Sequence, residues 1–182
     1  MLIASSKLPN SAIVECLLQI VLIFAMTLPM LILYTTSTLG PLLSQDLQFE
    51  SELLGYLVMS SFGLAAVLSL CAGTIVDSIG SRSVLLVLFY AVAAAFALIA
   101  LAENFYGLVV AAAICGIAQA LANPVTNLLI TQQIQPEKKA RVVGLKQSGV
   151  QLAALLAGLV LPAIAIHYGW RTAFCIVVPV AV

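Results

Sequence analysis

The sequence predicts an all-α membrane protein, built as a polytopic helical bundle. Hydrophobic residues make up 63% of the 182-residue chain and charged residues only 8%, whereas roughly 25% of the residues of a soluble domain are charged. The apolar residues form stretches of about 20, which suits a helix that crosses a bilayer and is about twice the length of a barrel strand. Because lipid offers no hydrogen bonds to the backbone, each stretch is expected to be a helix.

Five complete apolar stretches and the start of a sixth follow one another along the chain. The predicted spans are Ile13–Tyr34, Leu53–Val76, Ser83–Ala102, Phe105–Gln132, Ala140–His167 and, incomplete, Trp170–Val182. The first stretch contains Glu15 and Gln19 and lacks a small-residue cleavage site, so we expect a retained span and no signal peptide. Residues 1–182 are therefore predicted to form a single transmembrane domain.

The basic residues are distributed unevenly between the two sets of loops. Six of the seven lie on one side: Lys7, Arg82, Lys138, Lys139, Arg141 and Lys146. The opposite loops carry Asp46, Glu50, Glu52, Glu103 and the seventh basic residue, Arg171. Because short basic loops stay in the cytoplasm, we expect a multi-pass plasma-membrane protein of the bacterial inner-membrane kind, with a cytoplasmic N-terminus. The zero net charge gives no electrostatic basis for binding nucleic acid.

Residue sets typical of catalysis or metal binding are not found in the sequence. Cys16, Cys71, Cys115 and Cys175 lie far apart within apolar stretches, and His167 is the sole histidine. The sequence also has no phosphate-binding loop and no nucleophile–base pair at membrane depth. We therefore expect no cofactor, no metal and no enzymatic activity, and we interpret the cysteines as small buried hydrophobic residues.

The sharpest local pattern lies in the very short connection between the second and third spans, Gly73-Thr-Ile-Val-Asp77-Ser-Ile-Gly80-Ser-Arg82. Gly73 permits a close helix approach, and Gly80 can adopt the positive φ of a tight reversal. Asp77 and Arg82 are opposite charges at the membrane boundary, where partial desolvation strengthens their pairing.

This connection resembles that of the major facilitator superfamily, whose pattern here is Gly-x-x-x-Asp-x-x-Gly-x-Arg. The similarity extends to Gly116 and Pro124 in the fourth span, to Pro136-Glu137 with Arg141 and Gly144 at the fifth, and to Gly169-Trp170-Arg171 with Phe174 at the sixth. The resemblance implies the six-helix N-terminal domain of the family, ending here within the sixth span. It also implies a secondary transporter that moves a small solute by alternating access.

In that family the aspartate of the loop acts as a latch, pairing with basic residues and a helix end so that the cytoplasmic side is held shut. Carried onto this chain, the gating set is Gly73, Asp77, Gly80, Arg82 and Arg141, with the two arginines as partners of the aspartate. An ordinary capped turn with surface charges is the competing interpretation. Besides the lipid bilayer, the expected partner is the missing C-terminal half or a second copy, without which the chain is not expected to transport.

Two features depart from the proton-coupled exporters of the family. Ala112 stands where many of them carry an arginine, and the fifth span lacks their helix-bending proline. In the register of their Gly-x-x-x-Gly-Pro-x-x-Gly-Gly pattern the chain has Gly149, Ala153, Ala154, Ala157 and Gly158. These departures weaken the drug-antiporter interpretation, although small residues still allow close helix packing.

Polar side chains inside a membrane are costly and usually face a cavity or another helix. Gln119, Asn123 and Asn127 follow one another at four-residue steps, which predicts one stripe on the fourth span. We interpret Gln119 and Asn123 as substrate contacts in preference to helix–helix hydrogen bonds, whereas both interpretations stand equal for Asn127. In the family, the first and fourth spans line the pathway, the second and fifth flank it, and the third and sixth face outward.

The fifth span adds Lys146, Gln147 and Gln151 to the candidate pathway. For Gln151, substrate contact and packing stand equal. Lys146 is expected to extend to the membrane surface, with anion binding as the minority alternative. Glu15 is expected at the interface, with proton coupling as an outside alternative. Two small-residue ridges, Ala65-xxx-Ser69-xxx-Gly73 and Gly149-xxx-Ala153-xxx-Ala157, are predicted to pack helices within the bundle or at the sliding surface between halves.

A different function remains open on the sequence alone. A non-transporting membrane protein, such as a binding or assembly module that keeps the half-fold, has the same hydrophobic pattern. The identity of the small-molecule solute, the direction of movement and the coupling ion are not encoded in any motif described above, and the weakly charged stripe mildly favours a neutral or anionic solute.

Overall fold

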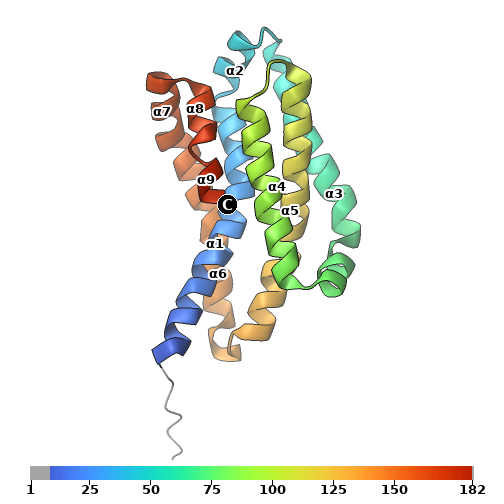
Figure 1. The fold of residues 1–182 in the computed structure, drawn as a ribbon, viewed down its shortest axis with the longest axis vertical. Coiled ribbons are helices and arrows are strands. Elements are labelled where there is room, and N and C mark those ends of the chain that lie inside the picture. The colour runs from blue at the N-terminus through green and yellow to red at the C-terminus, as the bar shows by residue number, and fades with distance from the viewer. Residues whose placement is uncertain (1–8, 182) are drawn as a thin grey trace, which may run out of the picture.

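The structure, a computed structural model, describes residues 9–181, which form a bundle of long helices (Figure 1). These residues contain helices and no strand, and five helical stretches are long and apolar enough to cross a membrane. The predicted fold class, an all-α polytopic bundle, is confirmed.

The helices follow the predicted spans closely. The long helices are α1 (Pro9–Thr38), α3 (Leu54–Ile79), α4 (Ser81–Ala100), α5 (Phe105–Gln133) and α6 (Pro136–Leu155). The shorter elements are α2 (Gly40–Asp46), the 3₁₀ turn η1 (Ser51–Leu53), the π-helical turn η2 (Leu156–Val160), α7 (Leu161–Tyr168), α8 (Trp170–Cys175) and α9 (Val178–Ala181). Because α6, η2 and α7 follow one another without a gap, they form one span-length helical segment, Pro136–Tyr168.

Helix ends coincide with residues that interrupt or cap the backbone. The Asn104 side chain accepts a hydrogen bond of 2.9 Å from the backbone N–H three residues later, which caps α5. Gly80 and Gly169 end α3 and α7 with φ of 87° and 85°, which side chains other than glycine rarely adopt. The tight reversal expected at Gly80 is thus present. Pro179 has no N–H for the Cys175 carbonyl, and α8 ends at that residue.

The connections between helices gather at two ends of the bundle (Figure 1). The start of α1, the α3–α4 turn and the α5–α6 connection lie at one end, and α2, the α4–α5 turn and the α7–α8 turn lie at the other. The first end carries Arg82 and the basic cluster at the start of α6. The helices therefore separate the basic connections from the acidic ones, as the charge pattern predicts.

Helices from the two halves of the sequence pack against each other. The second span, α3, packs chiefly on α5, and α1 packs chiefly on α6 and η2, while α1 and α5 also meet. Thirteen of the 29 residues of α5 are buried, against five of 26 in α3 and four of 20 in α6. The fourth span is therefore more enclosed than the second and fifth. The third span, α4, has eight of its 20 residues buried, so the outward-facing position that the resemblance implies for it is not seen.

Two glycines allow the closest of these helix contacts. A Cβ atom at Gly116 of α5 would collide with the Ser61 carbonyl oxygen of α3. A Cβ atom at Gly149 of α6 would lie 2.6 Å from the Ile23 carbonyl oxygen of α1. Because both obstacles are backbone atoms, neither helix pair could keep its separation with a larger residue.

At the end of the bundle opposite the basic connections, two side chains and a backbone carbonyl from other segments meet around Asp46. The indole N–H of Trp170 donates to Asp46 Oδ2 at 3.0 Å, and Arg171 lies 3.6 Å from the same oxygen. Arg171 also donates to the Ala102 carbonyl at 3.0 Å and stacks over the Trp170 ring at 4.6 Å. This cluster joins the end of α2, the α4–α5 turn and the start of α8.

The expectation for the cysteines is largely wrong. Only Cys115 is buried, whereas Cys16, Cys71 and Cys175 are exposed. These three lie on helix faces that no other described segment covers. Apolar character along the sequence locates a residue in a span, but the face it occupies depends on which neighbours the helix has.

Candidate functional site

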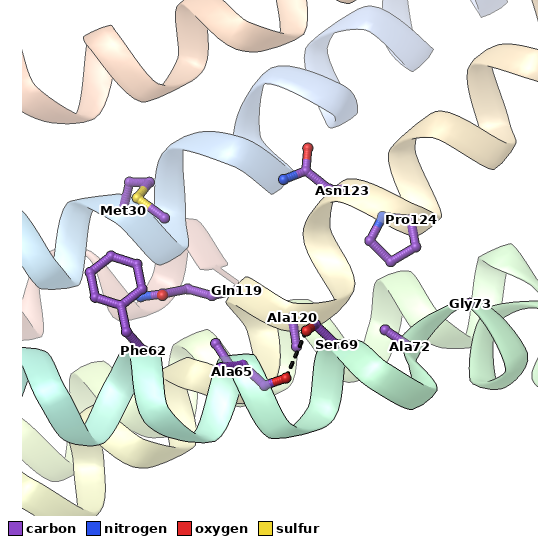
Figure 2. Close-up of a pocket in the computed structure, with 11 residues that line it drawn as sticks. Met30, Phe62, Ala65, Ser69, Ala72, Gly73, Gln119, Ala120, Asn123 and Pro124 are labelled. Atoms are coloured by element: carbon purple, nitrogen blue, oxygen red, sulfur yellow. Dashed lines mark hydrogen bonds between the residues drawn. The ribbon is translucent and has the colours of Figure 1, made fainter.

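A groove runs between α3 and α5, with Met30 of α1 at one side. Its volume is about 570 Å³. The lining residues are Met30, Phe62, Ala65, Ala66, Ser69, Ala72, Gly73, Gln119, Ala120, Asn123 and Pro124. In Figure 2, Ala65, Ser69 and Gly73 lie along α3, while Gln119 and Asn123 lie along α5. The groove thus brings the predicted α3 ridge beside two residues of the predicted polar stripe.

Hydrogen-bond acceptors without donors occupy part of this groove. The Gln119 Nε2 atom donates to Ser61 Oγ of α3 at 2.9 Å, but the buried Oε1 atom has no partner among the described residues. One turn further, Pro124 has no N–H to offer the Ala120 carbonyl. Buried acceptors are normally paired, so these two oxygens are unsatisfied polar groups of residues that line the groove.

The second polar feature is a cluster around Lys146 of α6, whose side chain is only 2% exposed. Its Nζ donates to Asn127 Oδ1 at 2.7 Å, Thr126 Oγ1 at 2.9 Å and Asn123 Oδ1 at 3.4 Å. The expectation that this lysine extends to the membrane surface is therefore wrong. Three oxygen acceptors on α5 hold the ammonium between the helices, although α5 and α6 otherwise make few contacts.

The predicted stripe on α5 winds around the helix. At 3.6 residues per turn, an eight-residue separation rotates a side chain by roughly 80°. Gln119 accordingly reaches Ser61 on α3, whereas Asn127 reaches Lys146 on α6. Asn123 contacts the lysine and also lines the groove, so it joins the two polar features.

Gln147 and Gln151 are not brought to the groove. Both are exposed on α6 and do not line it. They lie roughly 150° around the helix from the side, marked by Gly149 and Ala153, that packs on α1. Their place in a solute pathway stays a prediction.

The gating residues lie at the basic end of the bundle without the contacts expected of them. Asp77, Arg82 and Arg141 are exposed, and no ion pair joins Asp77 to either arginine within the described residues. A Cβ atom at Gly73 would meet no described atom within 4 Å. The pairing expected within this half is therefore not formed, and the close helix approach at Gly73 is absent among residues 9–181.

Glu15 forms an ion pair with the start of the fifth span. Its carboxylate lies 2.7 Å from Lys138 Nζ, and both side chains are partly exposed. The pair joins the N-terminal part of α1 to the first turn of α6. The interfacial position expected for Glu15 stays a prediction.

Two hydroxyl residues of the site were not predicted. Ser61 lies four residues before Ala65, so the small-residue ridge on α3 in fact starts one turn earlier. Thr126 donates to its own helix, to the Ala122 carbonyl at 2.6 Å, and thereby leaves its oxygen free to accept from Lys146. Such self-bonding is the usual behaviour of threonine in a helix, which is why the sequence offered no signal for the second contact.

The fold and the site define a class: a multi-pass membrane protein in which small and polar residues meet in a groove between apolar helices. The sequence profile of the Major Facilitator Superfamily matches residues 16–182. The chain belongs to the major facilitator superfamily.

Two relatives carry transporter names. The hexuronate transporter of Bacillus subtilis (strain 168) is 24% identical over 142 residues, which cover 78% of this chain and 33% of that protein. Probable anion transporter 5 of Arabidopsis thaliana is 34% identical over 93 residues, which cover 50% of this chain and 22% of that protein. The matched region thus spans a third or less of the length of each relative.

Proposed function

We propose that this chain forms one half of a secondary transporter that moves a small solute across the plasma membrane by alternating access. The observation that carries the proposal is the groove between α3 and α5, where Gln119 and Asn123 face the small residues of α3. Polar side chains and unpaired acceptors are costly in a membrane unless water or a solute reaches them. Transporters of this kind bind solutes at such positions, between helices with broken hydrogen bonding.

A second half, or a second copy of the chain, is proposed to supply the other wall of the pathway. This idea is supported by α3 and α6, which both lie in span-length segments but bury few of their residues. Each therefore has a face free to pack against a second half. By itself the chain would then bind solute weakly and would not transport.

Asp77 is proposed to act as the latch on the cytoplasmic side. Its carboxylate is exposed and has no ion-pair partner among residues 9–181. Gly73, one turn earlier, leaves room for a helix to approach. Both features fit a contact with the opposite half, which would form in one state and break in the other.

The relatives narrow the solutes that are worth testing first. One is named for hexuronate and the other for an anion. We therefore propose a negatively charged organic solute as the first class to test.

The proposed pathway can be tested by the reactivity of engineered cysteines. In a variant lacking the four native cysteines, Asn123→Cys should react with a water-soluble maleimide, because the groove admits water. The matched control is Ala94→Cys, an exposed position on α4, where lipid keeps the thiol protonated and unreactive. If neither thiol reacts with the maleimide, the polar stripe serves only to pack helices, and the proposal is contradicted.

The need for a second half is tested by reconstitution. Vesicles that contain on average one copy of the chain should show no saturable uptake of a labelled sugar acid. Robust uptake at one copy per vesicle would show that the chain transports as a monomer.

A further inference from the structure

Lys146 is the one charged side chain of the described residues that lies more than five residues inside a candidate span. It sits about 15 Å from the start of α6, at 1.5 Å per residue. No carboxylate among residues 9–181 lies within 4 Å of its ammonium. The cluster therefore carries an uncompensated positive charge inside the membrane, which is expensive and characteristic of functional positions.

The ammonium also determines how two amides on α5 are oriented. Because an ammonium can only donate, the atoms that Asn123 and Asn127 turn toward it must be their oxygens. The NH₂ group of each amide consequently points elsewhere. Neither NH₂ group has an acceptor among the described residues, and both asparagines are exposed.

The surface above Lys146 is thus rich in donors and poor in acceptors. Two NH₂ groups lie one helical turn apart, and the buried ammonium behind them polarises both amides. A group that accepts hydrogen bonds and carries negative charge, such as a carboxylate, complements this arrangement. A cation or a purely donating group would meet repulsion.

Asn123 extends the same surface into the groove, where Pro124 has no N–H for the Ala120 carbonyl. A solute with an acidic group at one end and hydroxyl groups at the other would satisfy both regions. We propose that Asn123 and Asn127, which the Lys146 ammonium orients and polarises, form the subsite for the acidic group of a small hydroxylated organic anion. This inference rests on the proposed function and assigns the residues that select its solute.

The test uses the purified 182-residue chain in lipid nanodiscs and equilibrium binding of two labelled sugars, D-glucuronate and D-glucose. They differ mainly in one carboxylate. Glucuronate should bind about tenfold more tightly, the ratio expected for one charge-assisted hydrogen bond.

Asn127→Asp is the decisive variant. The new carboxylate still accepts from the ammonium, so the link between α5 and α6 is kept, but the cluster becomes neutral. The preference for glucuronate over glucose should then fall to about threefold or less. If Lys146 served only to join the helices, this variant would melt at the same or a higher temperature and would keep the preference, which would overturn the inference.

Lys146→Met removes the charge by a second route and should lose the preference as well. Lys139→Met removes one positive charge near the start of α6, away from the amides, and should keep it. If the wild-type chain binds both sugars alike, the inference fails while solute binding stands. If it binds neither sugar, the inference fails too, and the reactivity of Asn123→Cys then decides whether the proposed pathway fails with it.

Discussion

The hydroxyl oxygen of Thr27 on α1 lies 3.0 Å from the carbonyl oxygen of Gly149 on α6 and 2.8 Å from that of Ile23 on its own helix, and its single hydrogen is shared between these two acceptors. The contact exists because Gly149 has no side chain to separate the two helices. It joins the first span to the fifth at a point where a Cβ atom would lie 2.6 Å from the Ile23 carbonyl and 2.8 Å from the Thr27 hydroxyl.

Gly149→Val should therefore destabilise the chain. The added methyl groups must push α1 and α6 apart, with an expected loss of about 1–3 kcal/mol in the free energy of unfolding. Gly144→Val is the matched control, since a Cβ atom there meets nothing within 4 Å, and it should change the free energy by no more than about 0.5 kcal/mol. Unfolding of both variants in detergent measures the difference, and equal effects would contradict the close contact.

Trp170→Phe should weaken the cluster around Asp46. Phenylalanine keeps most of the ring but cannot donate to the carboxylate, so a loss of about 1 kcal/mol is expected. Tyr168→Phe, at an exposed neighbouring position, should have little effect. If the two variants have the same melting temperature, the indole hydrogen bond contributes nothing measurable to stability.

Asp77→Asn should leave the stability of this chain unchanged to within about 0.5 kcal/mol, because the carboxylate is exposed and has no ion-pair partner among the described residues. Asp46→Asn, which loses its attraction for Arg171 and weakens the bond from Trp170, is the positive control and should lower the melting temperature. A clear loss of stability in Asp77→Asn would mean that this residue acts within its own half, against the proposed latch.

The orientation of the chain follows from where engineered cysteines react. In the background without native cysteines, Gln48→Cys should be labelled on intact cells by a membrane-impermeant maleimide. Ser78→Cys should be labelled only after the membrane is opened. Both positions are exposed and lie at opposite ends of the bundle, so the reverse pattern would place the Asp77–Arg82 turn outside the cell and refute the assigned sidedness.

The properties that could be predicted are those that depend on residues near one another in the sequence. The length of an apolar stretch gave the spans, and Gly80 and Asn104 mark the ends of helices by their own chemistry. The π-helical turn η2 was not predicted. It ends two residues before Pro162, which has no N–H for the Gly158 carbonyl, but a proline alone does not reveal whether a helix kinks, ends or widens.

The direction of a side chain depends on distant partners, and prediction was weakest there. Lys146 is expected at the surface because it lies only about 10 Å into its span, from where its long side chain can reach the interface. Its ammonium instead meets three acceptors on α5, and their presence depends on how α5 and α6 are rotated. The stripe of Gln119, Asn123 and Asn127 was recognised as a unit, yet its winding divides it between α3 and α6.

Because α1 packs on α6, helices far apart in the sequence must meet, and this has a consequence for biosynthesis. Thr27 and its partner Gly149 are 122 residues apart. At 5–20 residues per second, a ribosome needs about 6 to 24 s to synthesise that interval. During this time the first span must wait in the bilayer with its packing face turned to lipid or held by the insertion machinery.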